Sequence, residues 1–339
     1  MKMEKLVSVC IQTYRHSRYI KKCLDSILAQ ETDFDFEILL GEDESDDGTR
    51  EICIEYAKKY PQKIRLFLHS RSNNIYVNDR PTGKFNFFNN LKNSVGKYIA
   101  ICEGDDYWTD KTKLQKQIDF MESNTNYSIC FHAVKLLINN KLQSDCLTEI
   151  SGNEFTIADL ACGNFIHTPS VVYRNVFPKT LPEYFNAVPV GDYPLHMLAA
   201  RYGNIKYLPE AMAVYRIHEG GIHSENNIYR KIISGIETID LMIPHYRDMP
   251  DILELLIKQN YRLISDIYNL CINSKDDDNL LDLTRKYNFR ISGVNIKEFM
   301  KIITDLNARY NRLLNHPVSG KLIRFLAFLK NDRSFGARE

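Results

Sequence analysis

The first hundred residues alternate short apolar runs with longer segments of helical periodicity. The apolar runs are typical of buried strands. They occupy residues 6–11, 36–40, 64–68 and 97–102. The segments between them place apolar residues three and four positions apart, which predicts amphipathic helices. They occupy residues 17–30, 49–60 and 84–94. Strands that alternate with helices of this length predict βαβ units, and therefore an α/β fold with a mostly parallel sheet.

Polar clusters follow three of the four predicted strands. The segment TYRH (13–16) follows the first strand, GEDESDDGT (41–49) follows the second, and EGDD (103–106) follows the fourth. In open parallel sheets, ligands bind beyond the carboxyl ends of the strands. The sequence therefore predicts that three strand ends converge on one acidic crevice.

The cluster EGDD brings three carboxylates to the end of an apolar run. If the strand continues, alternation places Glu103 and Asp105 on the same side. Carboxylates packed in this way repel one another unless a cation offsets their charge, and their oxygens suit Mg²⁺ or Mn²⁺. The alternative is a solvated acidic turn that Gly104 makes easier. We expect a site for a divalent ion.

The cluster after the second strand has a calcium-binding and a helix-capping interpretation. The segment DESDDG (43–48) begins like an EF-hand loop, but Ile54 stands at the twelfth position, where that loop needs a glutamate. We interpret Asp46 or Asp47 as a cap of the next helix, since acidic residues favour helix starts. Asp43 lies closer to the strand end, and we expect it to bind a ligand.

Composition and charge give no support to a nucleic-acid-binding, membrane-spanning or disulfide-rich protein. Lys and Arg number 44 against 43 Asp and Glu, so net charge gives no support to a nucleic-acid partner. No run of about 18 apolar residues is present to span a bilayer, and the N-terminus is too polar for a signal peptide. The eight cysteines are scattered, without the clustering of a disulfide framework or a zinc site. These features favour a cytoplasmic protein.

Beyond residue 225 the pattern becomes helical throughout. We therefore expect two parts, a catalytic domain over 1–225 and an α-helical C-terminal region over 226–339, which could pack on the catalytic domain or on a second subunit. Residues 319–333 alternate apolar with basic residues, which is typical of helices that lie on the inner face of an anionic membrane. A terminal helix docked on its own domain is the alternative.

The order of three segments carries a family resemblance. VSVCIQTYRHSRYIKKCLDSILAQ, then FEILLGEDESDDGT, then GKYIAICEGDDYW resembles the inverting nucleotide-sugar glycosyltransferases of family 2, over roughly residues 5–225. The resemblance implies the GT-A fold, a Rossmann-like, mixed but mostly parallel sheet flanked by helices. It also implies a nucleotide-sugar donor, usually a UDP-sugar, a divalent metal, and a glycan or lipid-linked acceptor in surface polysaccharide synthesis.

The resemblance also implies roles for residues of the first two clusters. Thr13, Tyr14 and Arg15 would line the nucleotide site, and Asp43 would bind the base. The sequence departs from the family where many members carry an Arg-Asn pair, because Phe87 and Phe88 stand there. Lys84 or Arg80 is our candidate to replace that contact with phosphate.

The resemblance also implies roles for residues of the acidic motif and of the second half of the domain. Glu103, Gly104 and Asp105 match the family's DxD-like motif, with Glu in place of the first Asp. Asp105 would bind the metal, and Asp106 lies beside it. In AVPVGDYPLHMLAARYG (187–203) the resemblance places the catalytic base on Asp192, which could otherwise be a helix N-terminal acid. The run Tyr-Arg-Ile-His makes Arg216 and His218 candidates for the diphosphate and the metal.

Two other classes of function stay open. A nucleotidyltransferase would carry a Gly-rich, basic loop after the first strand, and QTYRHSR (12–18) has Arg15 and Arg18 but no glycine. A non-catalytic scaffold derived from a transferase would have lost Asp105 or Asp192, and both are present. The expected reaction is transfer of a sugar with inversion, in which Asp192 takes the proton of an acceptor hydroxyl.

Overall fold

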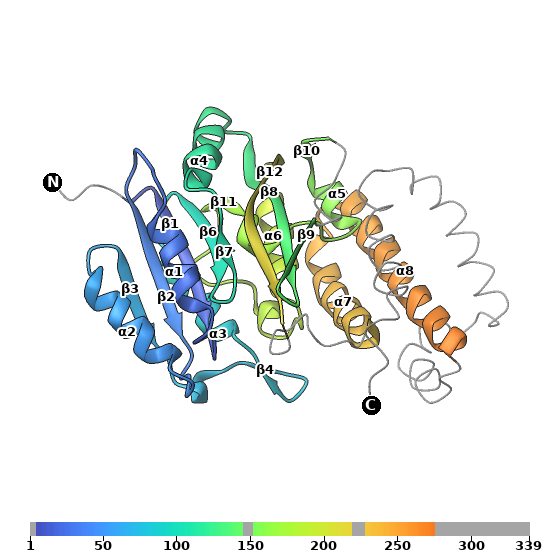
Figure 1. Cartoon of the computed structure of the whole chain (residues 1–339). Coiled ribbons are helices and arrows are strands. Elements are labelled where there is room, and N and C mark those ends of the chain that lie inside the picture. Colours follow the sequence, from blue (N-terminus) through green and yellow to red (C-terminus); the bar gives the residue numbers. More distant parts are fainter. Residues whose placement is uncertain (1–4, 145–151, 219–227, 275–339) are drawn as a thin grey trace.

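The computed structural model describes residues 5–144, 152–218 and 228–274 and contains one large sheet between two layers of helices (Figure 1). The strands of this sheet are β1 (Val7–Thr13), β2 (Phe36–Glu42), β3 (Ile64–Leu68), β6 (Tyr98–Glu103), β7 (Tyr107–Trp108), β8 (Tyr127–Ile138), β9 (Lys141–Ser144), β10 (Glu154–Phe155), β11 (Val172–Arg174) and β12 (Asn204–Ile217). A small separate hairpin is formed by β4 (Tyr76–Val77) and β5 (Arg80–Pro81).

The sheet has the strand order β10-β12-β8-β11-β6-β1-β2-β3, with β7 paired to β12 and β9 paired to β8. The run β3-β2-β1-β6 is parallel, and β11 is antiparallel to both of its neighbours. The four strands predicted from the apolar runs are therefore present as β1, β2, β3 and β6, and the mixed, mostly parallel sheet of the GT-A fold is confirmed.

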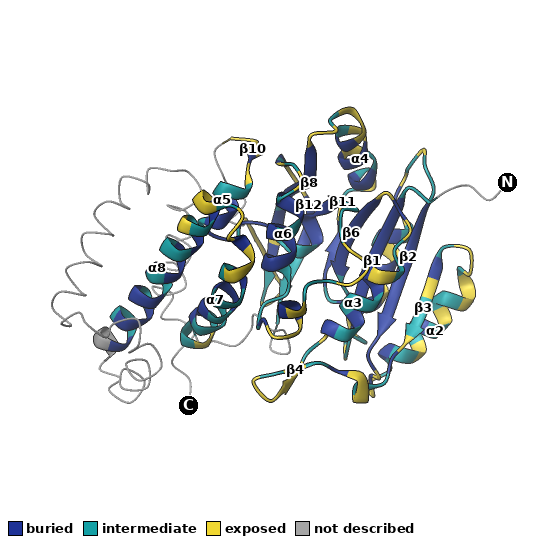
Figure 2. Cartoon of the chain, turned by 180° about the vertical axis from the view of Figure 1, so that it is seen from behind, coloured by how far each residue is buried: buried dark blue, intermediate teal, exposed yellow. Residues whose placement is uncertain are grey.

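The helices cover both faces of the sheet. They are α1 (Ile20–Leu28), α2 (Thr49–Lys59), α3 (Lys84–Asn93), α4 (Lys113–Ser123), α5 (Ile157–Ala161), α6 (Asp192–Ala200), α7 (Ile228–Met242) and α8 (Pro250–Ser274). Short 3₁₀ turns lie at Arg71–Asn73, Thr168–Ser170, Glu183–Asn186 and Ile243–Tyr246. Side chains of α1, α2 and α4 pack in one core cluster, and those of α3, α5 and α6 pack in another on the opposite face. The central strands β1, β2 and β6 between them are almost fully buried (Figure 2).

The register of the central strands aligns the three predicted ligand-binding ends. Thr13 at the end of β1 pairs with Glu42 at the end of β2, and Gln12 pairs with Glu103 at the end of β6. The three polar clusters therefore leave the sheet at one edge, as the sequence predicted. The end of β12 lies at the same edge. Val214 of β12 pairs with Tyr107 of β7, the strand that directly follows the acidic turn.

Part of the C-terminal region packs into the same core. Ile239 of α7 and Leu256 of α8 belong to the cluster that includes α5 and α6. The hydroxyl of Tyr193 in α6 donates a hydrogen bond of 2.8 Å to Gln259. The helices predicted there are confirmed up to residue 274, while residues 319–333 lie outside the described part of the chain. The boundary at residue 225 stays a prediction.

Two expectations about composition can be checked over the described ranges. None of the helices in residues 5–144, 152–218 and 228–274 is both long enough and apolar enough to cross a membrane. The seven cysteines in the same ranges are all free thiols, and six of them are buried. Cys23 and Cys102 approach to 3.9 Å between their sulfur atoms without bonding, so these cysteines act as small core residues.

Candidate active site at the carboxyl edge of the sheet

The acidic motif forms a tight turn rather than an extension of its strand. β6 ends at Glu103, and the backbone N–H of Asp106 donates to the carbonyl of Glu103 at 3.0 Å. Alternation along a continuing strand therefore does not relate Glu103 to Asp105, and that premise of the sequence analysis was wrong. The turn is possible because Gly104 lies against β1, where its N–H donates to the carbonyl of Gln12 at 2.9 Å.

Gly104 has no room for a side chain. A Cβ at this position would lie 2.6 Å from the hydroxyl of Thr13 and 2.8 Å from Nδ1 of His16. Both atoms are buried and have no hydrogen-bond partner among the described residues. Thr13 of β1 and Gly104 of the acidic turn, two of the predicted site residues, are therefore packed directly against each other.

Substitution of Gly104 by alanine should distort this packing. We expect Gly104→Ala to lower the free energy of unfolding by about 1–3 kcal/mol, the usual cost of forcing extra atoms into a packed site. Urea unfolding measures this change. Gly83→Ala is the matched control, because a Cβ there meets nothing within 4 Å, and it should change stability by less than about 0.5 kcal/mol. Equal effects of the two substitutions would contradict the contact.

Three side chains that suit a metal ion converge above the turn. Nε2 of His218 lies 2.9 Å from Oδ2 of Asp105, and Nε2 of His16 lies 3.8 Å from the same oxygen. One ligand atom from each residue falls within 4.8 Å of the others. They come from the ends of β12, β6 and β1, so the sheet register brings them together.

The pKa shifts of His16 and Asp105 both favour the form of each group that can bind a cation. Burial, helped by the nearby His218 and Arg216, lowers the pKa of His16 although Asp105 opposes the shift, so the ring is neutral near pH 7. Burial acts to raise the pKa of Asp105, but the hydrogen bond from His218 and the electrostatic interactions with His16 and His218 lower it overall. A carboxylate and two imidazoles form a donor set for a first-row divalent metal. His16 was quoted in the sequence analysis within TYRH, but it was not predicted as a ligand.

Asp106 and Arg216 connect the acidic turn to β12. Asp106 is 1% exposed, and its Oδ1 accepts from the backbone N–H of Arg216 at 2.7 Å. Nε of Arg216 donates to the carbonyl of Asp105 at 2.8 Å. Burial, with the charge of Asp105, raises the pKa of Asp106 well above its ordinary value. The Arg216 guanidinium lies 4.5 Å from the ring centre of Tyr19, which also contacts His218 with ring centres 4.8 Å apart.

Glu103, at the end of β6, has a strongly perturbed carboxyl group. Its pKa rises from 4.5 to about 8, first because of burial and then because of the charges of Asp105 and Asp192. The folded state therefore holds this proton more tightly than the unfolded chain does. The resulting stabilisation is complete below pH 4.5 and is lost as the pH rises through 8.

Replacement of Glu103 by its neutral isostere glutamine should remove the loss of stability at high pH. We expect Glu103→Gln to raise the melting temperature over wild type at pH 8.5 by about 5–10 °C, because a pKa shift of this size is worth several kcal/mol, and to have a much smaller effect at pH 5. Thermal unfolding in a chelating buffer at both pH values measures the difference. A difference of the same size at both pH values would show that the carboxyl does not titrate in this range.

Asp192 is the first residue of α6. It is partly exposed, and its Oδ1 accepts from the N–H of Tyr193 at 2.8 Å. Its charge acts on Glu103, on Tyr215 of β12 and on the buried His196. The structure thus places the predicted base near the acidic turn, although the two are far apart in sequence.

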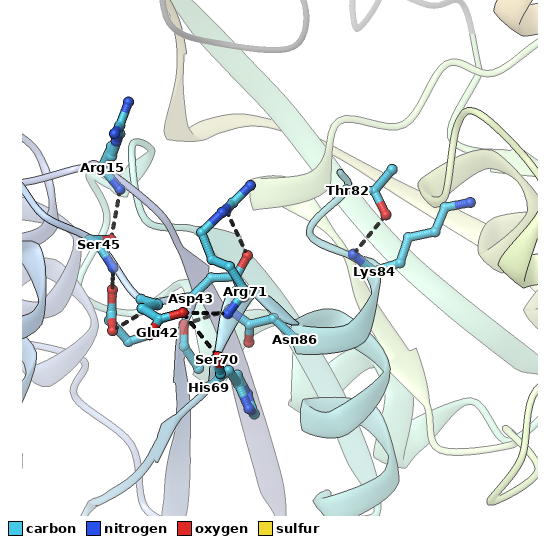
Figure 3. Close-up of polar contacts among 12 residues, drawn as sticks. Arg15, Glu42, Asp43, Ser45, His69, Ser70, Arg71, Thr82, Lys84 and Asn86 are labelled. Atoms are coloured by element: carbon cyan, nitrogen blue, oxygen red, sulfur yellow. Dashed lines mark hydrogen bonds and ion pairs between the residues drawn. The ribbon is translucent and has the colours of Figure 1, made fainter. Parts of the chain in front are cut away.

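The end of β2 forms a second polar cluster around Asp43 (Figure 3). Glu42 holds the following loop, because its carboxylate accepts from the N–H of Ser45 at 2.7 Å and pairs with Arg50. Asp43 is 2% exposed, and its Oδ2 pairs with Arg71 at 3.1 Å. Burial raises the pKa of Asp43.

Several polar atoms of this cluster have no hydrogen-bond partner among the described residues. They are Oδ1 of Asp43, both amide atoms of Asn74 and Nε2 of His69. Tyr14 lies beside them, with its ring centre 3.8 Å from the guanidinium of Arg71. Buried polar groups without partners are costly, so this cluster has the character of a site that a polar ligand completes. Asn74 and Arg71 were not predicted, because nothing in their local sequence distinguishes them from an ordinary loop.

The side chains of Arg15 and Lys84, both predicted to bind the donor, are directed away from the cluster around Asp43 (Figure 3). Arg15 forms two hydrogen bonds of 2.8 and 2.7 Å with the carboxylate of Asp46, so Asp46 does not cap α2. Asp47 is not the N-cap residue either, since Gly48 holds that position, but its carboxylate accepts from the N–H of Thr49, the first residue of α2, at 3.1 Å. Lys84 extends away from Asp43 (Figure 3) and donates to the carbonyls of Val188 and Asn186.

The sheet order and the acidic crevice define a GT-A fold, and comparison with known proteins gives the family. Residues 8–143 match the family described as Glycosyl transferase family 2. An uncharacterized protein of Mycobacterium tuberculosis is 38% identical over 231 residues, which cover 66% of this chain and 63% of that protein. The putative teichuronic acid biosynthesis glycosyltransferase TuaG of Bacillus subtilis is 31% identical over 178 residues, covering 52% of this chain and 58% of that protein.

A solved structure supports the fold. The mannosyltransferase PcManGT from Pyrobaculum calidifontis aligns with a TM-score of 0.54 over 98% of this chain and 89% of its own, at 14% identity. Over residues 8–143 the chain is a member of glycosyltransferase family 2. It spans a little under two thirds of the mycobacterial relative.

Proposed function

We propose that the chain transfers a sugar from a nucleotide diphosphate sugar, most simply a UDP-sugar, to an acceptor hydroxyl with inversion. The observation that carries this proposal is the convergence of His16, Asp105 and His218 at the acidic turn, where the charge of Asp192 also acts on Glu103. A metal-ligand set next to a carboxylate that could act as a base is what a metal-assisted displacement requires.

The nucleotide would bind along the ends of β1 and β2. The unpartnered carboxylate oxygen of Asp43 can accept the imide N–H of a uracil base, and the amide of Asn74 can donate to one of its carbonyls. Tyr14 would lie beside the base or ribose. This polar cluster supports a nucleoside ligand.

The diphosphate would lie over the acidic turn. His16, Asp105 and His218 would hold a divalent ion there, and Mn²⁺ suits two imidazoles better than Mg²⁺ does. When bound, such an ion neutralises the charge of the leaving diphosphate. Arg216 retains guanidinium donors that can share this charge, because the contact with Asp105 uses only one of its N–H groups.

Asp192 would act as the general base. Its carboxylate takes the proton of the acceptor hydroxyl while that oxygen forms a bond to the anomeric carbon. The bond between the anomeric carbon and the diphosphate oxygen breaks on the opposite face, and the nucleoside diphosphate leaves with the electron pair. A single displacement of this kind inverts the anomeric centre and needs no covalent enzyme intermediate.

The acceptor would be a glycan or a lipid-linked saccharide of a surface polysaccharide. This part of the proposal draws support from the similarity to TuaG, a putative glycosyltransferase of teichuronic acid biosynthesis. We place the reaction in the cytoplasm, where the scattered free thiols remain reduced.

Calorimetric titration tests the donor class. UDP, GDP, dTDP and CDP are titrated into the protein with Mn²⁺, with Mg²⁺ or with a chelator. We expect UDP to bind with Mn²⁺ and its affinity to collapse with chelator. Preference for another diphosphate would change the donor but keep the mechanism. Failure of every nucleotide to bind the folded protein would favour a non-catalytic scaffold.

A further inference from the structure

The first residue of α3 is a buried lysine in an unfavourable place. Lys84 is 6% exposed, and burial lowers its pKa to about 8. A positive charge at a helix N-terminus also opposes the helix dipole. Burial and position both disfavour a cation here, so the contacts of its amine must offset a considerable cost.

Those contacts all lie on the loop that leads to Asp192. The amine of Lys84 donates to the carbonyl of Val188 and, at 3.4 Å, to that of Asn186. Val188 is fully buried, and four residues after it α6 begins with Asp192. From the other side, the hydroxyl of Thr238 in α7 accepts from the N–H of Val190 at 3.2 Å. The loop 186–191 is therefore held between α3 and α7.

The rest of α3 is attached to the strand ends of the proposed nucleotide site. The amide of Asn86 donates to the carbonyl of Gly41 at 2.8 Å, and that of Asn90 donates to the carbonyl of Ile11 at 2.9 Å. Asn86 sits so close that a Cβ on Gly41 would lie 1.6 Å from its Oδ1. One short helix thus contacts β1, β2 and the loop before Asp192 through buried polar side chains.

We propose that Lys84 is a positioning residue that sets the placement of the Asp192 carboxylate relative to the nucleotide-binding strand ends. It acts through the carbonyls of Asn186 and Val188 and does not contact the donor phosphate. The inference rests on the proposed function, since it assigns Lys84 a role in presenting the general base.

If Lys84 has this role, its replacement should lower the rate of turnover without weakening the binding of the donor. Lys84→Met keeps the length of the side chain and removes its donors. We expect kcat to fall by about 30- to 100-fold, because a displacement of about 1 Å at a reacting group can cost a factor of this size. The affinity for UDP and the KM for the donor should change by less than about twofold. Lys92→Met, an exposed lysine on the same helix, is the matched control and should match wild type in every quantity.

Hydrogen exchange gives a second measurement that needs no substrate. In Lys84→Met the backbone amides of residues 187–191 should exchange at least tenfold faster than in wild type, with those of β1 and β2 unchanged. If this variant does not fold, Lys84→Gln, which keeps one amide donor, takes its place with the same expected separation.

The outcomes distinguish the inference from the function on which it rests. A loss of UDP affinity of tenfold or more in Lys84→Met would show that Lys84 contacts the donor phosphate, and would overturn the proposal. An unchanged kcat with unchanged exchange would also overturn it. Failure of the wild-type protein to bind any nucleotide would instead overturn the proposed function.

Discussion

Replacement of Asp192 by asparagine should lower kcat by about 10³-fold while leaving UDP affinity within about twofold of wild type. Removal of a general base typically costs between 10² and 10⁴ in rate. Asparagine keeps the shape of the side chain and can still interact with the helix start, where Asp192 accepts from the N–H of Tyr193. Steady-state kinetics with a UDP-sugar, together with calorimetry of UDP, measure the two quantities.

Asp251→Asn is the matched control for this substitution. Asp251 is also an acidic residue in the first turn of a helix, but it is exposed on α8. Its replacement should change neither kcat nor UDP affinity by more than about twofold, and should cost less than about 1 kcal/mol of stability through the helix dipole. If Asp192→Asn behaves like this control, Asp192 is a helix N-terminal acid and the base lies elsewhere.

Replacement of Asp105 should have its largest effect on binding. We expect Asp105→Asn to weaken UDP binding in the presence of Mn²⁺ by about 100-fold, which corresponds to about 2.7 kcal/mol. The carboxylate lies between both histidines of the cluster, so its loss removes the charge that would hold a divalent ion. In chelator, wild type and variant should bind UDP equally weakly.

A direct measurement of Mn²⁺ binding without nucleotide separates metal loss from other causes. Electron paramagnetic resonance of free Mn²⁺ should show that wild type binds the ion and that Asp105→Asn does not at the same concentration. Asp110→Asn, in the loop after the acidic turn, is the control, because Asp110 pairs with Lys116 and Thr112. Equal metal binding by wild type and Asp105→Asn would contradict the cluster as a metal site.

The sequence alone was sufficient to predict the parallel strands β1, β2, β3 and β6. The runs that became β1, β2 and β6 are apolar because both faces of these strands are covered by helices, so their burial is visible in composition alone. Their polar ends could be placed at one edge because parallel strands share a direction. The convergence of Thr13, Asp43 and the acidic turn was predictable for this reason.

The details of the site depend on contacts that local sequence does not record. His16 faces Asp105 only because Gly104 lets the turn lie against β1. Lys84 looked like a free basic residue near a phosphate, yet its partners lie 102 and 104 positions further along the chain. Arg15 is directed away by Asp46, 31 residues later. Such pairings are set by tertiary structure.

Sugar transfer with inversion from a nucleotide sugar can be tested by following one reaction. The protein is incubated with Mn²⁺, an α-linked UDP-sugar and a panel of saccharide acceptors, and the released nucleotide and the anomeric proton of the product are observed by nuclear magnetic resonance. We expect release of UDP and a β-linked product. An α-linked product would contradict the single displacement assigned to Asp192, and release of pyrophosphate from a nucleoside triphosphate and a sugar phosphate would show a nucleotidyltransferase instead.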